Sequence, residues 1–189
     1  MKTIRISKLE MAKRIARFAA LKPLPIQNAS IPEKARDVVY ARKLLSVIGL
    51  DTPTPVSAEA PVRGAAGMTM TLAVCPPGQG PGLHSHRETY ETFTVLEGEF
   101  EVRWNDDGGE REVLRQFDTI SIPPGVCRAF RNIGREEGIL QVIITGGVHN
   151  MNDIAFTEGA RREIEAVAPG LAAQFEQTGF TFDASETSR

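Results

Sequence analysis

The chain has 189 residues, of which 41% are hydrophobic and 24% are charged, and its formal net charge is -2. This composition is typical of a globular protein and suffices for one domain with an extension. No run approaches the roughly 18 uninterrupted apolar residues of a membrane span, and the charged N-terminal region does not resemble a secretory signal. Two cysteines are too few for a disulfide scaffold. We therefore expect a cytoplasmic protein without a membrane partner.

The near-neutral total conceals a separation of charge along the chain. Residues 1–43 contain 11 of the 22 Lys and Arg residues and only three acidic residues, so this segment carries a charge of +8. The remainder of the chain carries -10. Because opposite charges attract, we expect the basic arm to pack on the acidic body or to cross to a second copy in a homodimer.

Two helices are predicted in residues 1–50, which we assign to a basic helical arm. The first begins at a capping box formed by Ser7 and Glu10 and ends before Pro23. The second begins at Pro32 and ends at Gly49. Its apolar stripe consists of Ala35, Val38, Ala41, Leu45 and Ile48, and that of the first helix includes Met11, Ile15 and Phe18. The proline-rich residues 51–66 are predicted to be a linker.

From about residue 67 the apolar residues recur with a period of two, which indicates strands. Gly and Pro residues separate seven short segments that are rich in β-branched and aromatic residues: 68–75, 90–96, 100–104, 112–115, 119–122, 126–132 and 139–145. The spacing predicts an all-β domain over residues 67–150, an antiparallel β-barrel or jelly roll. Residues 151–189 are expected to form a C-terminal helix, interrupted at Pro169-Gly170, and a loose tail.

Two of the three histidines, His84 and His86, lie two residues apart, and Glu91 begins the next predicted strand. Residues two apart on a strand face the same side, and a hairpin-like return can bring the carboxylate to the same point. Two imidazoles and one carboxylate suit Fe(II), Mn(II), Ni(II) or Zn(II) and leave coordination positions open. The alternative is that all three are ordinary surface residues.

Residues 78–98 follow the pattern Gly-x5-His-x-His-x4-Glu-x6-Gly, which resembles the first motif of the cupin superfamily in every position. Cupins are small β-barrels that often hold a metal inside. The resemblance therefore implies a β-barrel and a metal bound by His84, His86 and Glu91. The arm and the C-terminal helix lie outside the resemblance.

Residues 117–132 are similar to the second cupin motif, Gly-Asp-x4-Pro-x-Gly-x2-His-x3-Asn, with two departures. Phe117 replaces the glycine, and Arg128 replaces the histidine ligand. A guanidinium stays protonated and does not coordinate a metal. The resemblance therefore implies three protein ligands instead of four, with Arg128 in the same cavity. There Arg128 either holds an anionic ligand by forked hydrogen bonds or pairs with an acidic residue such as Glu91 in a barrel that has lost its metal.

Other residues have open assignments. His149, after the last predicted strand, is either a fourth ligand or proton shuttle over the barrel mouth, or a plain loop residue. Cys127 is expected on the face opposite Arg128, in the core. The residues that share strand parity with Glu91 or Arg128 line a cavity or belong to an ordinary core: Phe93, Val95 and Phe130.

Three functional hypotheses follow. The favoured one is a metal-binding cupin in which Arg128 orients a small anionic or enol-type molecule. If it is an enzyme, the open metal face suits a dioxygenase in which Glu91 or His149 moves a proton. The second is a non-catalytic barrel that binds a metabolite or carbohydrate without metal. The third is a homodimeric interaction protein whose arm carries the function. Nucleic acid is not an expected partner, because the arm lacks a compact helix-turn-helix.

Overall fold

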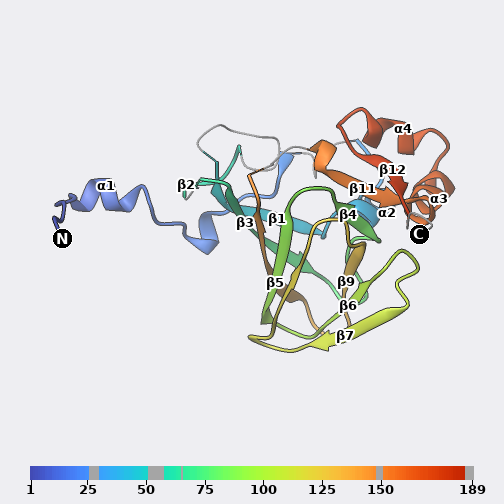
Figure 1. Cartoon of the computed structure of the whole chain (residues 1–189), viewed down its shortest axis with the longest axis horizontal. Helices are drawn as coiled ribbons and strands as arrows, with labels where there is room; N and C mark the ends of the chain where they lie inside the picture. Colours follow the sequence, from blue (N-terminus) through green and yellow to red (C-terminus); the bar gives the residue numbers. More distant parts are fainter. Residues whose placement is uncertain (26–29, 51–57, 65, 148–150, 186–189) are drawn as a thin grey trace.

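The computed structural model describes residues 1–25, 30–50, 58–64, 66–147 and 151–185. Most of these residues belong to two six-stranded sheets (Figure 1). In the order in which they pair, the strands of the first sheet are β2 (Val62–Arg63), β1 (Lys43–Gly49), β3 (Met68–Cys75), β10 (Gly138–Thr145), β5 (Tyr90–Glu97) and β8 (Thr119–Ile122). Those of the second are β12 (Thr181–Ala184), β11 (Ile154–Thr157), β4 (His84–His86), β9 (Arg128–Asn132), β6 (Phe100–Trp104) and β7 (Glu110–Leu114).

The described helices either precede β1 in the sequence or follow β10. They are α1 (Lys8–Ala12), η1 (Phe18–Ala20), α2 (Glu33–Val39), η3 (Met151–Asp153), α3 (Glu158–Val167) and α4 (Leu171–Glu176). None of the described helices has the length and apolar character needed to cross a membrane.

All seven predicted strand segments are strands, but the expected antiparallel barrel is wrong in two respects. The pairs β1–β2 and β11–β12 are parallel, and the described strands form two mixed sheets instead of a closed barrel. The physical reason is the connection between the paired strands. A parallel pair requires a long crossover, and α3 and α4 supply one between β11 and β12. The predicted division into four units stays a prediction.

The second predicted helix is correct only in its first half. The helix α2 ends at Val39, Tyr40 is extended (φ -128°), and Lys43–Gly49 form a strand that pairs antiparallel with β3. Within that strand Leu45 and Val47 are buried. The segment is therefore a case in which sheet pairing and burial override a helical stripe.

The chain ends follow the predictions in part. The predicted capping box is confirmed, because Ser7 Oγ accepts from the Glu10 N–H at 3.2 Å and Glu10 accepts from the Ser7 N–H at 2.9 Å. The helix nevertheless stops at Ala12. The interruption at Pro169-Gly170 is also confirmed, since it separates α3 from α4. The first two residues of the predicted tail, Asp183 and Ala184, belong to β12, and residues 186–189 lie outside the described residues.

One departure from the second cupin motif has a visible backbone consequence. Phe117, which stands where that motif has glycine, has a positive φ of 72°. This left-handed conformation is easy for glycine and strained for a bulky residue. The turn before β8 thus holds a bulky residue in a left-handed conformation, with the ring of Phe117 exposed.

Two buried clusters stabilise the fold. The first lies between the sheets and includes Phe93, Phe100, Phe130 and Leu140. The second joins α2 to the C-terminal elements through residues from both ends of the chain: Val39, Tyr40, Phe156, Ile164, Phe175 and Phe180. Figure 1 shows α2 beside α3 and β11, whereas the segment with α1 extends away from the sheets. The two ends of the chain therefore share one core against the second sheet.

Candidate metal centre

The three residues predicted to bind metal are brought together between the sheets. His84 and His86 lie on β4 of the second sheet, and Glu91 lies on β5 of the first. One ligand atom from each lies within 4.8 Å of the others, and all three residues are buried. The Nε2 atoms of His84 and His86 are 3.7 and 3.9 Å from Glu91 Oε2. The strand alternation of an His-x-His pair places both imidazoles toward one carboxylate.

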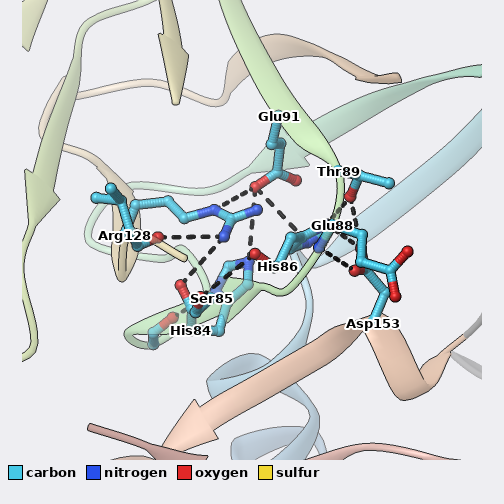
Figure 2. Close-up of polar contacts among 10 residues, drawn as sticks. His84, Ser85, His86, Glu88, Thr89, Glu91, Arg128 and Asp153 are labelled. Carbon is cyan, nitrogen blue, oxygen red and sulfur yellow. Dashed lines mark hydrogen bonds and ion pairs between the residues drawn. The ribbon is translucent and has the colours of Figure 1, made fainter. Parts of the chain in front are cut away.

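Hydrogen bonds fix the orientation of each imidazole (Figure 2). The Nδ1 atom of His84 is 2.9 Å from the carbonyl of Gly82. A carbonyl only accepts, so Nδ1 carries the hydrogen and Nε2 presents its lone pair to the centre. The Nδ1 atom of His86 donates to Thr89 Oγ1 at 2.8 Å, because the Thr89 hydroxyl donates to Asp153 Oδ2 at 2.5 Å. Both rings therefore have the tautomer that a metal ligand needs.

Arg128 fills the space behind the cluster. It is completely buried, and its Nε donates to Glu91 Oε2 at 2.8 Å. Its Nη1 lies 3.5 Å from the His84 carbonyl and 3.4 Å from the Val126 carbonyl, while its Nη2 has no hydrogen-bond partner. The predicted alternative, a pair with Glu91, is thus present in the structure.

The electrostatics keep the carboxylate ionised and an imidazole neutral. Burial acts to raise the pKa of Glu91, but the positive charge of Arg128, together with the interactions with His86 and His84, outweighs it and holds the pKa well below its usual range. Burial, aided by Arg128, lowers the pKa of His86. A neutral imidazole and a carboxylate are the protonation states that metal binding requires. The donor set therefore fits a divalent transition metal, and Fe(II), Mn(II), Ni(II) and Zn(II) all accept such ligands.

A cavity of about 110 Å³ adjoins the cluster. His84, His86, Glu91 and Asp153 contribute its charged or ionisable lining, and most of the rest is apolar. Much of the apolar wall comes from outside the strands that carry the cupin motifs: Leu24, Val39, Tyr40, Ala41, Leu44, Met151, Ile154, Phe156 and Phe180. The two ends of the chain therefore close the site.

The structure shows which of the residues with open assignments line the cavity. Phe130 lines the cavity, whereas Phe93 and Val95 belong to the core between the sheets without lining it. Cys127 is buried, as expected. Arg128, which was expected in the same cavity, is not among the lining residues; its guanidinium contacts the Glu91 carboxylate instead. His149 lies outside the described residues.

The family comparison agrees with this geometry. Residues 71–144 match the family model described as the cupin domain. The chain contains a cupin domain.

Solved structures match the chain with low sequence identity and with TM-scores below 0.5. A Bacillus halodurans protein is 24% identical, and the match covers 47% of this chain and 69% of that one with a TM-score of 0.43. A Klebsiella pneumoniae protein with a double-stranded β-helix domain is 25% identical, with coverages of 44% and 70% and a TM-score of 0.40. KdgF from a Halomonas species is 14% identical, with coverages of 55% and 80% and a TM-score of 0.42. No curated protein matches the chain significantly.

Sequence reasoning missed two supporting residues of the cupin site. Thr89 and Asp153 hold the Nδ1 side of His86, and Asp153 also accepts from the Glu88 N–H at 2.8 Å. Thr89 lies three residues after His86, in the connection to β5. Asp153 carried no signal, because it lies after the last motif strand and reaches the site only through the pairing of β11 with β4.

Asp153 makes the stability of this site depend on pH. Burial acts to raise its pKa, but hydrogen bonds with His86, Thr89 and the Glu88 N–H lower it to about 2, below the ordinary value of about 3.9. A lowered folded-state pKa stabilises the fold above pH ~4, and this contribution is lost as the pH falls toward ~2. Asp153→Asn should therefore lower the free energy of unfolding by about 1 kcal/mol at neutral pH. It should also make the loss of stability at acidic pH less steep than in the wild type.

Urea unfolding between pH 2 and 7 measures this effect. Asp106→Asn, in the turn between β6 and β7, is the matched control and should follow the wild type. If the free energy of unfolding of Asp153→Asn falls between pH 4 and 2 as steeply as that of the wild type, ionised Asp153 is not a source of the stability at neutral pH.

Proposed function

We propose that the protein binds a divalent metal through His84, His86 and Glu91 and acts on a small anionic or enol-type molecule in the adjoining cavity, as a metal-dependent dioxygenase. The observation that supports this is the orientation of the imidazoles. Both Nδ1 atoms are held by acceptors, so both Nε2 lone pairs face the same carboxylate. A bound metal would supply Lewis-acid polarisation of a chelating substrate.

The protein's own residues define what this site does. Thr89 and Asp153 orient His86, and the apolar walls exclude bulk water, which strengthens electrostatic interactions inside. Glu91 stays ionised beside Arg128, so it can accept a proton only from a strong acid or after the pair separates. The 189 residues include only two cysteines, too few for a disulfide scaffold, so we place the protein in the reducing cytoplasm.

Metal analysis of the purified protein tests this proposal. The wild type should carry close to one equivalent of a transition metal after reconstitution, and Glu91→Gln and His84→Ala should lose most of it because each removes one of three ligands. Glu97→Gln, at the exposed end of the same strand, is the matched control and should bind as the wild type does. Less than about a tenth of an equivalent in the wild type, unchanged in His84→Ala, would contradict the proposal.

A second candidate is a binding domain without metal, favoured by the Arg128–Glu91 ion pair of 2.8 Å. The two candidates make opposite predictions for Arg128→His, which removes a cation and restores the histidine of the second cupin motif. If the site binds metal, this variant should bind Zn(II) at least about tenfold more tightly in a competitive chelator titration. Arg131→His, on the exposed face of the same strand, should leave the affinity unchanged.

The metal-free candidate instead predicts that Arg128→His does not acquire metal. It also predicts that stabilisation of the wild type by small carboxylates persists in EDTA and is lost in Arg128→His. Equal Zn(II) affinity in Arg128→His and the wild type would therefore favour the binding domain.

The N-terminal segment supports a third element of the proposal, a homodimer. The exposed apolar side chains Ile4, Leu9, Met11, Ile15 and Phe18 all lie in this segment. The segment is basic, whereas the body of the chain carries -10. Charge complementarity therefore favours a second copy of the chain as the occupant of this surface, with apolar contacts buried on docking.

Sedimentation of the full-length protein tests this dimer. The double variant Ile15→Asp and Phe18→Asp should be monomeric with its metal content intact, and the wild-type dimer should weaken as salt concentration rises. Phe117→Asp changes an exposed apolar residue of the body and should remain dimeric. A monomeric wild type at tens of micromolar would contradict the proposal.

A further inference from the structure

The lining of the cavity beside the metal centre includes Tyr40, whose hydroxyl the proposed function does not use. This residue follows α2 and lies outside the region that resembles cupins. Its side chain is only 5% exposed, and its hydroxyl oxygen is buried without a hydrogen-bond partner. An unpaired hydroxyl in a buried position is uncommon, because it costs about 1–3 kcal/mol relative to a satisfied one.

Tyr40 is firmly held, so a loose position of its side chain does not explain why its hydroxyl lacks a partner. The backbone N–H of Tyr40 donates to the Arg36 carbonyl at 2.8 Å, and its carbonyl accepts from Gln79 Nε2 at 2.8 Å. Its ring packs against Phe175 and Phe180, with centroid distances of 6.5 and 6.0 Å. The ring is therefore fixed by aromatic residues of the C-terminal elements, and a phenylalanine would make the same contacts without the cost of the hydroxyl.

The rest of the cavity indicates what this hydroxyl would meet. The ionisable groups His84, His86, Glu91 and Asp153 form the polar part of the lining, and apart from two threonines the remainder is apolar. Burial raises the pKa of Tyr40, so its hydroxyl stays protonated and is a hydrogen-bond donor. A ligand that satisfies it must carry an acceptor away from its metal-binding end.

The volume limits the size of that ligand. An engineered cavity of about 150 Å³ accepts the six non-hydrogen atoms of benzene, so in proportion the 110 Å³ here holds about four non-hydrogen atoms of a ligand besides the group bound at the metal centre. Sugar acids and phosphorylated sugars are too large and too polar for such a lining.

We propose that Tyr40 determines specificity in this site by donating a hydrogen bond to an oxo group of a short-chain oxo acid whose carboxylate lies at the metal centre. This inference rests on the proposed metal function. It goes further by naming the substrate class and by assigning a residue from the N-terminal extension to its recognition.

The test compares Tyr40→Phe with the wild type in two ways. In the ligand-free protein the variant should be as stable as the wild type or more stable, because it removes an unpaired hydroxyl. In the Zn(II)-loaded protein, calorimetric titration compares 3-oxobutanoate with pentanoate, which has the same number of non-hydrogen atoms but no oxo group. The wild type should prefer 3-oxobutanoate by about tenfold, and Tyr40→Phe should lose that preference.

Tyr90→Phe is the matched control, because Tyr90 is the second of the two tyrosines and is exposed. It should retain the wild-type preference. Equal preference in Tyr40→Phe and the wild type would overturn the inference, as would binding of neither acid to metal-loaded protein. A loss of stability in ligand-free Tyr40→Phe would also overturn it, because the hydroxyl would then have a structural partner. These outcomes can be distinguished from failure of the proposed metal function, which would appear as an absence of bound metal in the wild type.

Discussion

The buried pair of Arg128 and Glu91 is the interaction on which the rest of the site depends. Arg128 is completely buried and Glu91 nearly so, and removing either partner would leave an uncompensated charge in a low-dielectric interior, a change that typically costs several kcal/mol. The pair also connects the two sheets, because Glu91 lies on β5 and Arg128 on β9. The same carboxylate oxygen faces both histidines. A metal at this point therefore shares its carboxylate ligand with a guanidinium, which weakens the metal site relative to one with a fourth neutral ligand.

The second constraint on the site is its closure by the two ends of the chain. Strands β11 and β12 extend the second sheet next to β4, and α2 packs against the C-terminal helices. This arrangement brings Asp153 behind His86 and Tyr40 into the cavity wall. The segments outside the cupin domain are therefore part of the site, and they make the cavity small and mainly apolar. A cupin fold alone does not specify such a pocket, since the chemistry of a site is carried by its side chains.

The sequence predicted the parts of this structure that have local signals. Alternation and turn residues located the seven strands, the motif spacing located the three clustered ligands, and Pro169-Gly170 located the break between α3 and α4. The errors lie where distant segments decide the outcome. Residues 43–49 have a helical stripe but pair with β3, and the parallel pairs depend on which segments dock at the sheet edges. Asp153 and Tyr40 had no motif, because their proximity to the site arises from packing between the chain ends.

The charges of the site favour an anionic ligand when a metal is present. Among the described residues that meet at the centre, Glu91 and Asp153 are ionised and Arg128 is cationic, while His86 is held neutral. With both imidazoles neutral, as metal ligation requires, these groups carry one net negative charge before the metal is counted. A divalent metal would convert this to one net positive charge in a site with little access to water. Because an uncompensated buried charge is costly, a monoanion would restore neutrality. The same balance explains how Arg128 is compatible with a metal site, since the guanidinium raises the positive potential that draws the carboxylate of a substrate toward the metal.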